Sequence, residues 1–335
     1  MSSEAVKNSP EKGSLVLLIA AFAAVYIIWG STYLAIKYAI ETIPSFIMAG
    51  ARFTLAGSIL LLIGRLSKGY EKPKLVHWRT SVIVGALLLV IGNGGVVIAE
   101  HYISSSLAAL LVATNPFWIV ILSWAFMKSG RPSLKVTIGL LIGFLGVWLL
   151  VSGQGSQAAG DGSNQLLGTG LIVFATLGWA VGSLYGSKAP AAKSTFTAAG
   201  MQMLSGGVIM LLISIITGEW SGFDISRVSR VSWIALVYLV SFGAIVAYTA
   251  YSWLLRNASP TAATTYAYVN PAVAVFLGWA IAGESITAQI LAGSAIIVGS
   301  VALITLQKKG AKKKPEAVGI HNSINPPAVR ENYST

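Results

Sequence analysis

The 335-residue chain is 55% hydrophobic and only 10% charged, with a mean hydropathy of +0.74, whereas soluble domains carry about 25% charged residues. This composition indicates an integral membrane protein. The chain has no cysteine, which excludes disulfides, thiolate chemistry and palmitoylation. Its three histidines, His77, His101 and His321, show no metal-ligand spacing, so we expect no metal site and no cofactor.

Ten apolar stretches are each long enough to cross a bilayer as a helix of about 20 residues. In chain order the predicted spans cover residues 15–36, 45–64, 80–99, 105–127, 134–153, 166–187, 195–217, 232–255, 260–281 and 287–306. The first stretch is too long for the core of a signal peptide, so we interpret it as a retained span. The predicted fold class is an all-α polytopic membrane protein with ten transmembrane helices.

The polar segments divide the chain into two halves of five spans. Residues 1–14 are predicted to form a cytoplasmic tail, and residues 15–153 the first five-helix repeat. A Gly/Ser/Gln-rich stretch at 154–165 is typical of a flexible linker, and the second five-helix repeat follows at 166–306. The tail at 307–335 opens with a lysine cluster and is predicted to be disordered and cytoplasmic.

Lysine and arginine concentrate on one side of the predicted spans. Nineteen of the 23 fall on the side of the two termini, whereas only Lys37, Arg227 and Arg230 fall on the other side and Arg52 within a span. The positive-inside rule then places both termini in the cytoplasm, and we expect a bacterial inner (plasma) membrane. The net charge of +12 therefore needs no nucleic-acid partner. The expected partners are the lipid bilayer and a small-molecule substrate, and the sequence fixes no oligomeric state.

One stretch occurs twice. Residues 106–129 and 261–284 share a Trp-Ala pair and an Asn-Pro pair at an offset of 155 residues. Proline removes a backbone donor and frees a carbonyl inside the apolar run, so both prolines are predicted helix breaks. Matching breaks in two halves predict a binding site near the middle of the membrane. The pairs are Asn115-Pro116 and Asn270-Pro271.

Further pairs extend the repeat. Trp29 corresponds to Trp179, and Arg52 corresponds to Gln202, both at an offset of 150 residues. Because each half has an odd number of spans, the second half enters the membrane from the opposite side. The sequence therefore predicts a 5 + 5 inverted repeat, an architecture that can open alternately to the two sides.

With these motifs in place, residues 15–306 resemble the drug/metabolite transporter superfamily, and within it the EamA-type ten-span exporters. The resemblance rests on the two Asn-Pro spans and on three short segments, Trp29-Gly30-Ser31, Ala51-Arg52-Phe53 and Gly283-Glu284. It implies a 5 + 5 bundle that moves small metabolites, often amino acids, usually outward. Relatives often carry a glutamate at the position of Gly130, so a role of that carboxylate would here rest on Glu284 alone or be absent.

Polar and aromatic side chains within the spans are candidates for substrate binding, since polar groups in hydrocarbon need partners. The structural alternatives stay open: the asparagines can pair with carbonyls freed by proline, the arginine can snorkel outward, and the tyrosines can bond within the bundle. An aromatic and amide wall suits an amphipathic ligand such as an amino acid with an apolar side chain. The candidates are Trp29, Ser31, Thr32, Arg52, Asn93, Asn115, Trp179, Ser183, Gln202, Tyr248, Tyr251 and Asn270.

The predicted function is secondary transport of small metabolites, with amino acids or similar amphipathic solutes moving outward by alternating access around a midplane cavity. Exchange of sugars or nucleotide-sugars is the alternative within transport, and a channel or a membrane-embedded hydrolase are alternatives outside it. The chain shows no phosphate-binding motif and no serine with a helix-borne histidine base, so no enzyme is expected. Glu100 and Glu284 lie at span ends and no acidic residue occupies a span centre, so we expect passive or weakly proton-linked transport.

Overall fold

The computed structural model describes residues 12–126, 131–152, 162–257 and 266–307. Gly130, most of the predicted linker and the lysine-rich tail from residue 308 lie outside these ranges. Every regular element of the described residues is a helix.

The first half of the chain supplies five spans. The segment from α3 to α4 is one continuous apolar stretch, Leu75–Ala99, whose middle is a π-helix, and α5 with α6 forms another, Ser105–Phe126. The helices are α1 (Lys12–Ala39), α2 (Ser45–Leu66), α3 (Leu75–Gly85), η1 (Ala86–Asn93), α4 (Gly94–Ala99), α5 (Ser105–Val112), α6 (Asn115–Phe126) and α7 (Leu134–Ser152).

The second half has the same order of spans, with a short 3-10 helix, η3, before its third span and one helix, α13, in place of α5 and α6. Its third span again contains a π-helix, η4, in the place that η1 occupies in the first half. The helices are α8 (Gly162–Gly186), α9 (Thr195–Ile216), η3 (Ile225–Arg227), α10 (Arg230–Tyr238), η4 (Leu239–Val246), α11 (Ala247–Asn257), α13 (Tyr266–Ala282) and α14 (Ala288–Gln307).

These helices account for the ten predicted spans. Seven helical stretches of the described residues are long and apolar enough to cross a membrane, and three shorter apolar helices lie at the predicted fifth, ninth and tenth spans. The all-α, ten-helix prediction is therefore confirmed. Several helices begin before their predicted spans: α1 at Lys12, α3 at Leu75 and α8 at Gly162, inside the predicted linker. In each case polar residues before the apolar run continue the helix instead of ending it.

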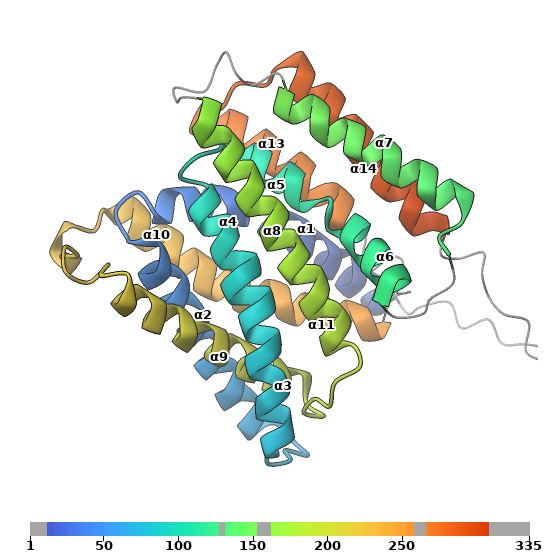
Figure 1. Cartoon of the computed structure of the whole chain (residues 1–335). Coiled ribbons are helices and arrows are strands. Elements are labelled where there is room, and N and C mark those ends of the chain that lie inside the picture. Colours follow the sequence, from blue (N-terminus) through green and yellow to red (C-terminus); the bar gives the residue numbers. More distant parts are fainter. Residues whose placement is uncertain (1–11, 127–130, 153–161, 258–265, 308–335) are drawn as a thin grey trace, which may run out of the picture.

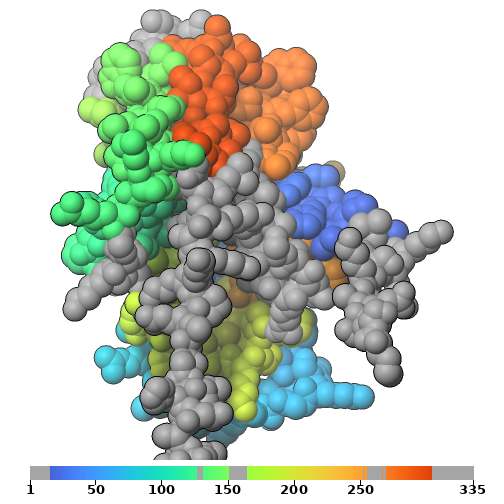
Figure 2. All heavy atoms as spheres, turned by 90° about the vertical axis from the view of Figure 1, so that its right-hand side faces the viewer, coloured from blue at the N-terminus to red at the C-terminus, as the bar shows by residue number. Residues whose placement is uncertain are grey.

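Helices of the first half pack against helices of the second half (Figure 1). α2 packs on α9 and α7 packs on α14, so each pair joins equivalent spans of the two halves. Figure 2 shows red α14 beside the green residues of the first half at the top of its visible face. α1 contacts α13 and α11, and the equivalent helix α8 contacts the equivalent helices α6 and α4. Each of these contacts between the halves thus has a counterpart with the halves exchanged, as expected for an inverted repeat.

Glycines let α2 and α9 approach each other closely. Gly57 on α2 and Gly207 on α9 are equivalent residues, and Gly200 lies one heptad before Gly207. A Cβ atom at Gly57 would collide with the backbone nitrogen of Leu204, and one at Gly200 would lie 2.8 Å from the backbone nitrogen of Leu61. Small residues at such interfaces are a main source of helix association in membranes.

The two Asn-Pro stretches differ in structure. The first is broken as predicted: α5 ends at Val112, α6 begins at Asn115, and the Thr114 hydroxyl donates to the Leu111 carbonyl at 2.6 Å. The second is not, because α13 continues through Pro271. The predicted break at Pro271 is therefore wrong. A proline near a helix start removes only one hydrogen bond, which a gentle kink can accommodate.

Candidate functional site

Three aromatic rings gather between α1, α11 and α13. The ring centroid of Trp29 lies 5.1 Å from that of Tyr251 and 5.0 Å from that of Tyr266, and the two tyrosine rings are 5.6 Å apart. Two of the three contacts are edge-to-face, a favourable arrangement for aromatic rings. The indole nitrogen of Trp29 also donates to the Gly243 carbonyl of η4 at 3.2 Å, so this wall is held in place from two helices.

Two predicted hydroxyl residues of α1 stand next to this wall. Thr32 is buried and donates to the carbonyl of Trp29 at 2.6 Å. The Ser31 hydroxyl donates to the Ile28 carbonyl at 2.8 Å and lies 2.6 Å from the Tyr238 hydroxyl of α10. Both side chains therefore have partners within the protein, which supports a positioning role for them.

Two further predicted residues are buried and carry polar atoms without partners. Arg52 of α2 is 4% exposed, and Asn270 of α13 is 8% exposed. The arginine Nε and Nη1 and the asparagine Oδ1 have no hydrogen-bond partner among the described residues. A Cβ atom at Gly243 would lie 3.3 Å from Nη2 of Arg52, so the guanidinium reaches the glycine that Trp29 binds. Unpaired buried polar groups are costly, and in a membrane interior they indicate function.

The equivalent residues of the other repeat form a second group. Trp179 of α8 lies against Gly92 of η1, where a Cβ atom would be 2.9 Å from its ring. The Asn115 side chain donates to the Thr176 carbonyl of α8 at 3.2 Å, so this amide pairs with another helix and not with a carbonyl freed by its own proline. Asn93, the last residue of η1, has a buried Oδ1 without a partner among the described residues.

The twelve candidates thus fall into two groups related by the repeat, with unequal burial. Grouped by the helices that carry them, the first group (α1, α2, α11 and α13) contains Trp29, Ser31, Thr32, Arg52, Tyr248, Tyr251 and Asn270, and the second (η1, α6, α8 and α9) contains Asn93, Asn115, Trp179, Ser183 and Gln202. Trp179 is 37% exposed, and the exposed Ser183 hydroxyl donates to the carbonyl of Trp179 in its own helix. The second group is therefore the more open one. α5 contacts both α1 and α8 and so lies between the two groups.

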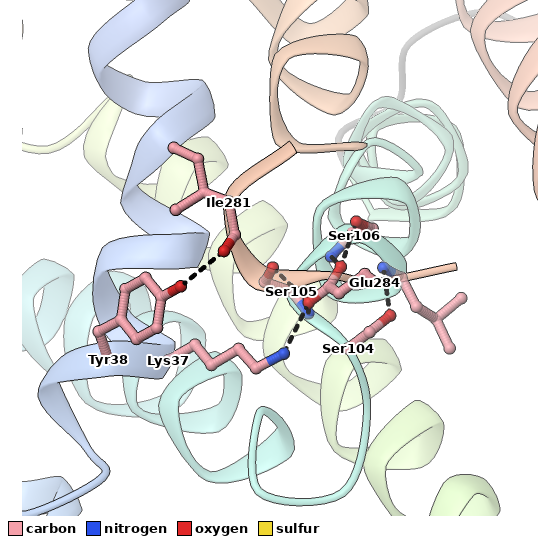
Figure 3. A network of polar contacts seen from close by, with 8 residues as sticks. Lys37, Tyr38, Ser104, Ser105, Ser106, Ile281 and Glu284 are labelled. Carbon is pink, nitrogen blue, oxygen red and sulfur yellow. Dashed lines mark hydrogen bonds and ion pairs between the residues drawn. The ribbon is translucent and has the colours of Figure 1, made fainter. Parts of the chain in front are cut away.

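Glu284 connects three spans at one end of the bundle (Figure 3). We call this the outer end, because the charge pattern predicts that it faces away from the cytoplasm. Gly283, with a left-handed φ of +65°, ends α13 and turns the chain toward α5. Glu284 then accepts from Lys37 Nζ at 2.9 Å and from the backbone nitrogens of Ser105 and Ser106 at 3.0 and 3.1 Å. The hydroxyls of Ser105 and Ser106 donate to it as well.

We call Lys37, Ser105, Ser106 and Glu284 the outer network. The two backbone donors are free N–H groups in the first turn of α5, where the helix dipole favours a carboxylate. Burial alone raises the pKa of Glu284, but the bonds from Ser106, Lys37 and Ser105 and the charge of Lys37 together bring this pKa below its ordinary value. The carboxylate is therefore ionised at neutral pH.

Glu100 is a buried carboxylate that the sequence did not reveal. It follows α4 at the outer end, is 6% exposed, and neither of its side-chain oxygens has a hydrogen-bond partner among the described residues. The sequence predicted no buried carboxylate because this residue ends a span. In the folded protein the carboxylate lies near the charged groups of three other segments, Glu284, Lys37 and Arg52, which interact with it electrostatically.

Comparison with known proteins identifies the chain. A family model matches it twice, over residues 12–152 and 166–306, once in each half. The chain belongs to the EamA-like transporter family. With its ten helices it is a membrane transporter, and the predicted superfamily is confirmed. A relative of similar length supports this: "Uncharacterized inner membrane transporter YedA" of Escherichia coli (strain K12) is 39% identical over 304 residues, covering 90% of this chain and 94% of that protein.

Two more distant proteins are also similar to this chain. "Uncharacterized transporter YvbV" of Bacillus subtilis (strain 168) is 25% identical over 326 residues, covering 94% of this chain and 98% of that protein. A solved structure, described only as "Crystal structure of protein", is 19% identical with a TM-score of 0.59 and covers 88% of this chain and 99% of that one. At this identity the likeness concerns the fold alone.

An apolar groove of about 620 Å³ opens between α6 and α8 of this EamA-like bundle. Among its lining residues are Leu122, Phe126, Val181 and Leu184, and none of the twelve candidates is among them. Its lining suits lipid tails better than a polar solute, so we do not assign the substrate to it.

Proposed function

We propose that the chain is a secondary transporter that moves small amphipathic solutes outward across the inner membrane by alternating access. One observation carries this proposal. The Trp29 indole nitrogen donates to the Gly243 carbonyl and the Trp179 ring lies against Gly92, each time between the first helix of one half and the π-helix of the other. The tryptophans are equivalent residues of the repeat, and the glycines lie at nearby but not equivalent positions of the two π-helices. Equivalent tryptophans that contact the opposite π-helix at different points and with unequal burial are what inverted repeats in two different arrangements would produce.

Amino acids with apolar side chains fit the first group best. The rings of Trp29, Tyr251 and Tyr266 offer an apolar surface, and Arg52 offers unpaired donors of the kind that bind a carboxylate as a fork. The Asn270 oxygen can accept from an ammonium group. A nucleotide-sugar is a poorer fit, because a diphosphate would meet only one basic residue within the spans.

The proposed orientation has both termini in the cytoplasm. Reporter fusions after Gln307 and within residues 68–74 should then report the cytoplasm, and fusions within residues 155–164 the outside. The name of the Escherichia coli relative supports an inner-membrane location. An external C-terminus would remove a span from the count and contradict the inverted repeat.

The transported solute should appear in the growth medium. Cells that express the protein are expected to accumulate apolar amino acids outside, relative to cells that carry an Asn270→Ala variant at equal membrane abundance. The Asn270 oxygen has no protein partner among the described residues, so this change should cost substrate affinity several-fold to about tenfold while thermal stability is kept. Metabolite profiling of the medium measures the first quantity and thermal unfolding in detergent the second.

Asn115→Ala and Asn322→Ala serve as controls. Asn115 is bonded to α8, so its loss should lower stability by about 0.5–1.5 kcal/mol, and Asn322 in the C-terminal tail should have no effect. Unchanged export by the Asn270 variant together with reduced stability would show that this amide stabilises the fold and does not bind substrate. Equal amino-acid profiles, with differences confined to other solutes, would contradict the substrate class and leave the transport mode in place.

A further inference from the structure

Glu100 lies in surroundings that disfavour a charged carboxylate. Its side chain is almost fully buried, and neither oxygen receives a hydrogen bond from the described residues. An isolated ionised carboxylate in such a place costs far more than a neutral one, and the usual outcome is that the group takes up a proton. The outer network, by contrast, surrounds Glu284 with five donors, so two carboxylates of one region have opposite environments.

The groups that face Glu100 come from three of the segments around it. From α1 they are Lys37 and Tyr33, from α2 Arg52, and from the turn after α13 Glu284. α4 also packs on α8 and η1. η1 has no titratable residue, and the only one of α8, Tyr185, lies at its far end.

These neighbours leave the carboxylate without a counter-ion in contact. Lys37 is bonded to Glu284, and Arg52 forms no ion pair within 4.0 Å among the described residues. His101, next in the chain, lies 2.8 Å from the Ser45 hydroxyl through its Nε2, and burial lowers its pKa. Burial raises the pKa of Glu100 well above its ordinary value and Glu284 raises it further, although Lys37 and Arg52 act in the other direction.

We propose that Glu100 is a proton-binding site and that closure of the outer end traps a proton on it. The proposal rests on the alternating access proposed above. When the outer network separates, water reaches the carboxylate and the pKa returns toward its ordinary value. When the network re-forms, a proton from outside water forms an O–H bond with a Glu100 oxygen, and the neutral acid is buried. No electron transfer and no other reactant is required.

This site changes the expected energetics of transport. The closed outer end binds the proton more tightly than the open one, so lowering the external pH must favour closure. The proton returns to outside water when the outer end opens again. Closure of the outer end would then be linked to the external pH, a stronger proton dependence than the passive or weakly proton-linked transport that the sequence suggested.

The absence of cysteine allows a direct test without any substrate. Ala109 is 1% exposed and lies four residues after Ser105 on α5, hence on the same helix face. In an Ala109→Cys variant, a membrane-impermeant thiol reagent added outside should label the thiol slowly at pH 6 and faster at pH 8, by up to about tenfold per pH unit. Tyr102→Cys, in an exposed position of the adjacent turn, corrects for the pH dependence of the reagent.

The deciding variant is Glu100→Gln in the Ala109→Cys background. A neutral amide mimics the protonated acid, so the thiol should stay protected at both pH values. Glu41→Gln, at an exposed position of the same end, should keep the full pH response. A pH response that survives Glu100→Gln, or no response in the parent variant, would overturn the proton site. A thiol that is never labelled, even with Glu284→Ala, would overturn alternating access itself.

Discussion

A Glu284→Ala variant is expected to open the outer end of the bundle. The change removes one ion pair and four hydrogen bonds at once, and it leaves the Lys37 ammonium and two N–H groups of α5 without partners. Breaking a buried pair from one side is strongly unfavourable, whereas water can satisfy the same groups in an open state. Labelling of Ala109→Cys from outside should therefore rise at least about tenfold, which corresponds to about 1.4 kcal/mol.

The matched control is Glu71→Ala. Glu71 also pairs with a lysine, Lys193, but both side chains are largely exposed at the opposite end. Exposed ion pairs contribute about 0–1 kcal/mol, so this variant should leave the labelling rate unchanged. Equal labelling of the Glu284 variant and its parent would show that the outer network does not hold the two sides apart.

The largest loss of folded protein is expected from Gly57→Ala. The added methyl group would collide with the backbone of α9 at Leu204, and neither backbone can move aside as a flexible side chain could. Overpacking typically costs about 1–3 kcal/mol, and we expect the upper end of that range here. Thermal unfolding in detergent and the yield of monodisperse protein measure the effect.

Gly170→Ala is the comparison for this variant. Gly170 lies within α8 and a Cβ atom there meets nothing within 4 Å. Alanine is about 1 kcal/mol better than glycine in a helix interior, so stability should stay the same or rise. If both variants unfold alike, the α2–α9 interface is looser than its glycine contacts indicate.

Much of the fold could be predicted from the sequence because length and hydropathy act locally. A run of about 20 apolar residues must satisfy its backbone internally in lipid, and a helix does so. The repeat was visible because pairs such as Trp29 and Trp179 keep their spacing. The π-helices were not visible, since one extra residue per turn leaves no mark in an apolar run.

The candidate site was harder to predict, because it depends on which helices meet. Asn115 and Asn270 look equivalent in sequence, yet one pairs with α8 and the other has an oxygen without a described partner. Glu100 and Glu284 both end spans, yet one is unpaired and the other has five donors. The donors that surround Glu284 belong to Lys37 and to α5, which are distant from it in the chain. The Gly283-Glu284 ending was the one signal that pointed to the outer network.

The two ends of this transporter are not equally secured. By the offsets of the repeat, Lys37 corresponds to Ser187 and Glu284 to Ser129, so the sequence supplies no second lysine–glutamate pair at the equivalent positions. The empty protein should therefore rest with its outer side shut and its inner side free to open. A carrier that is mostly in its binding-competent state binds with its full intrinsic affinity. If only a fraction of the molecules is in that state, the apparent affinity falls in proportion to that fraction. We expect the resting molecule to favour solutes presented from the cytoplasm, so the direction of transport would already be biased before any solute or proton gradient acts.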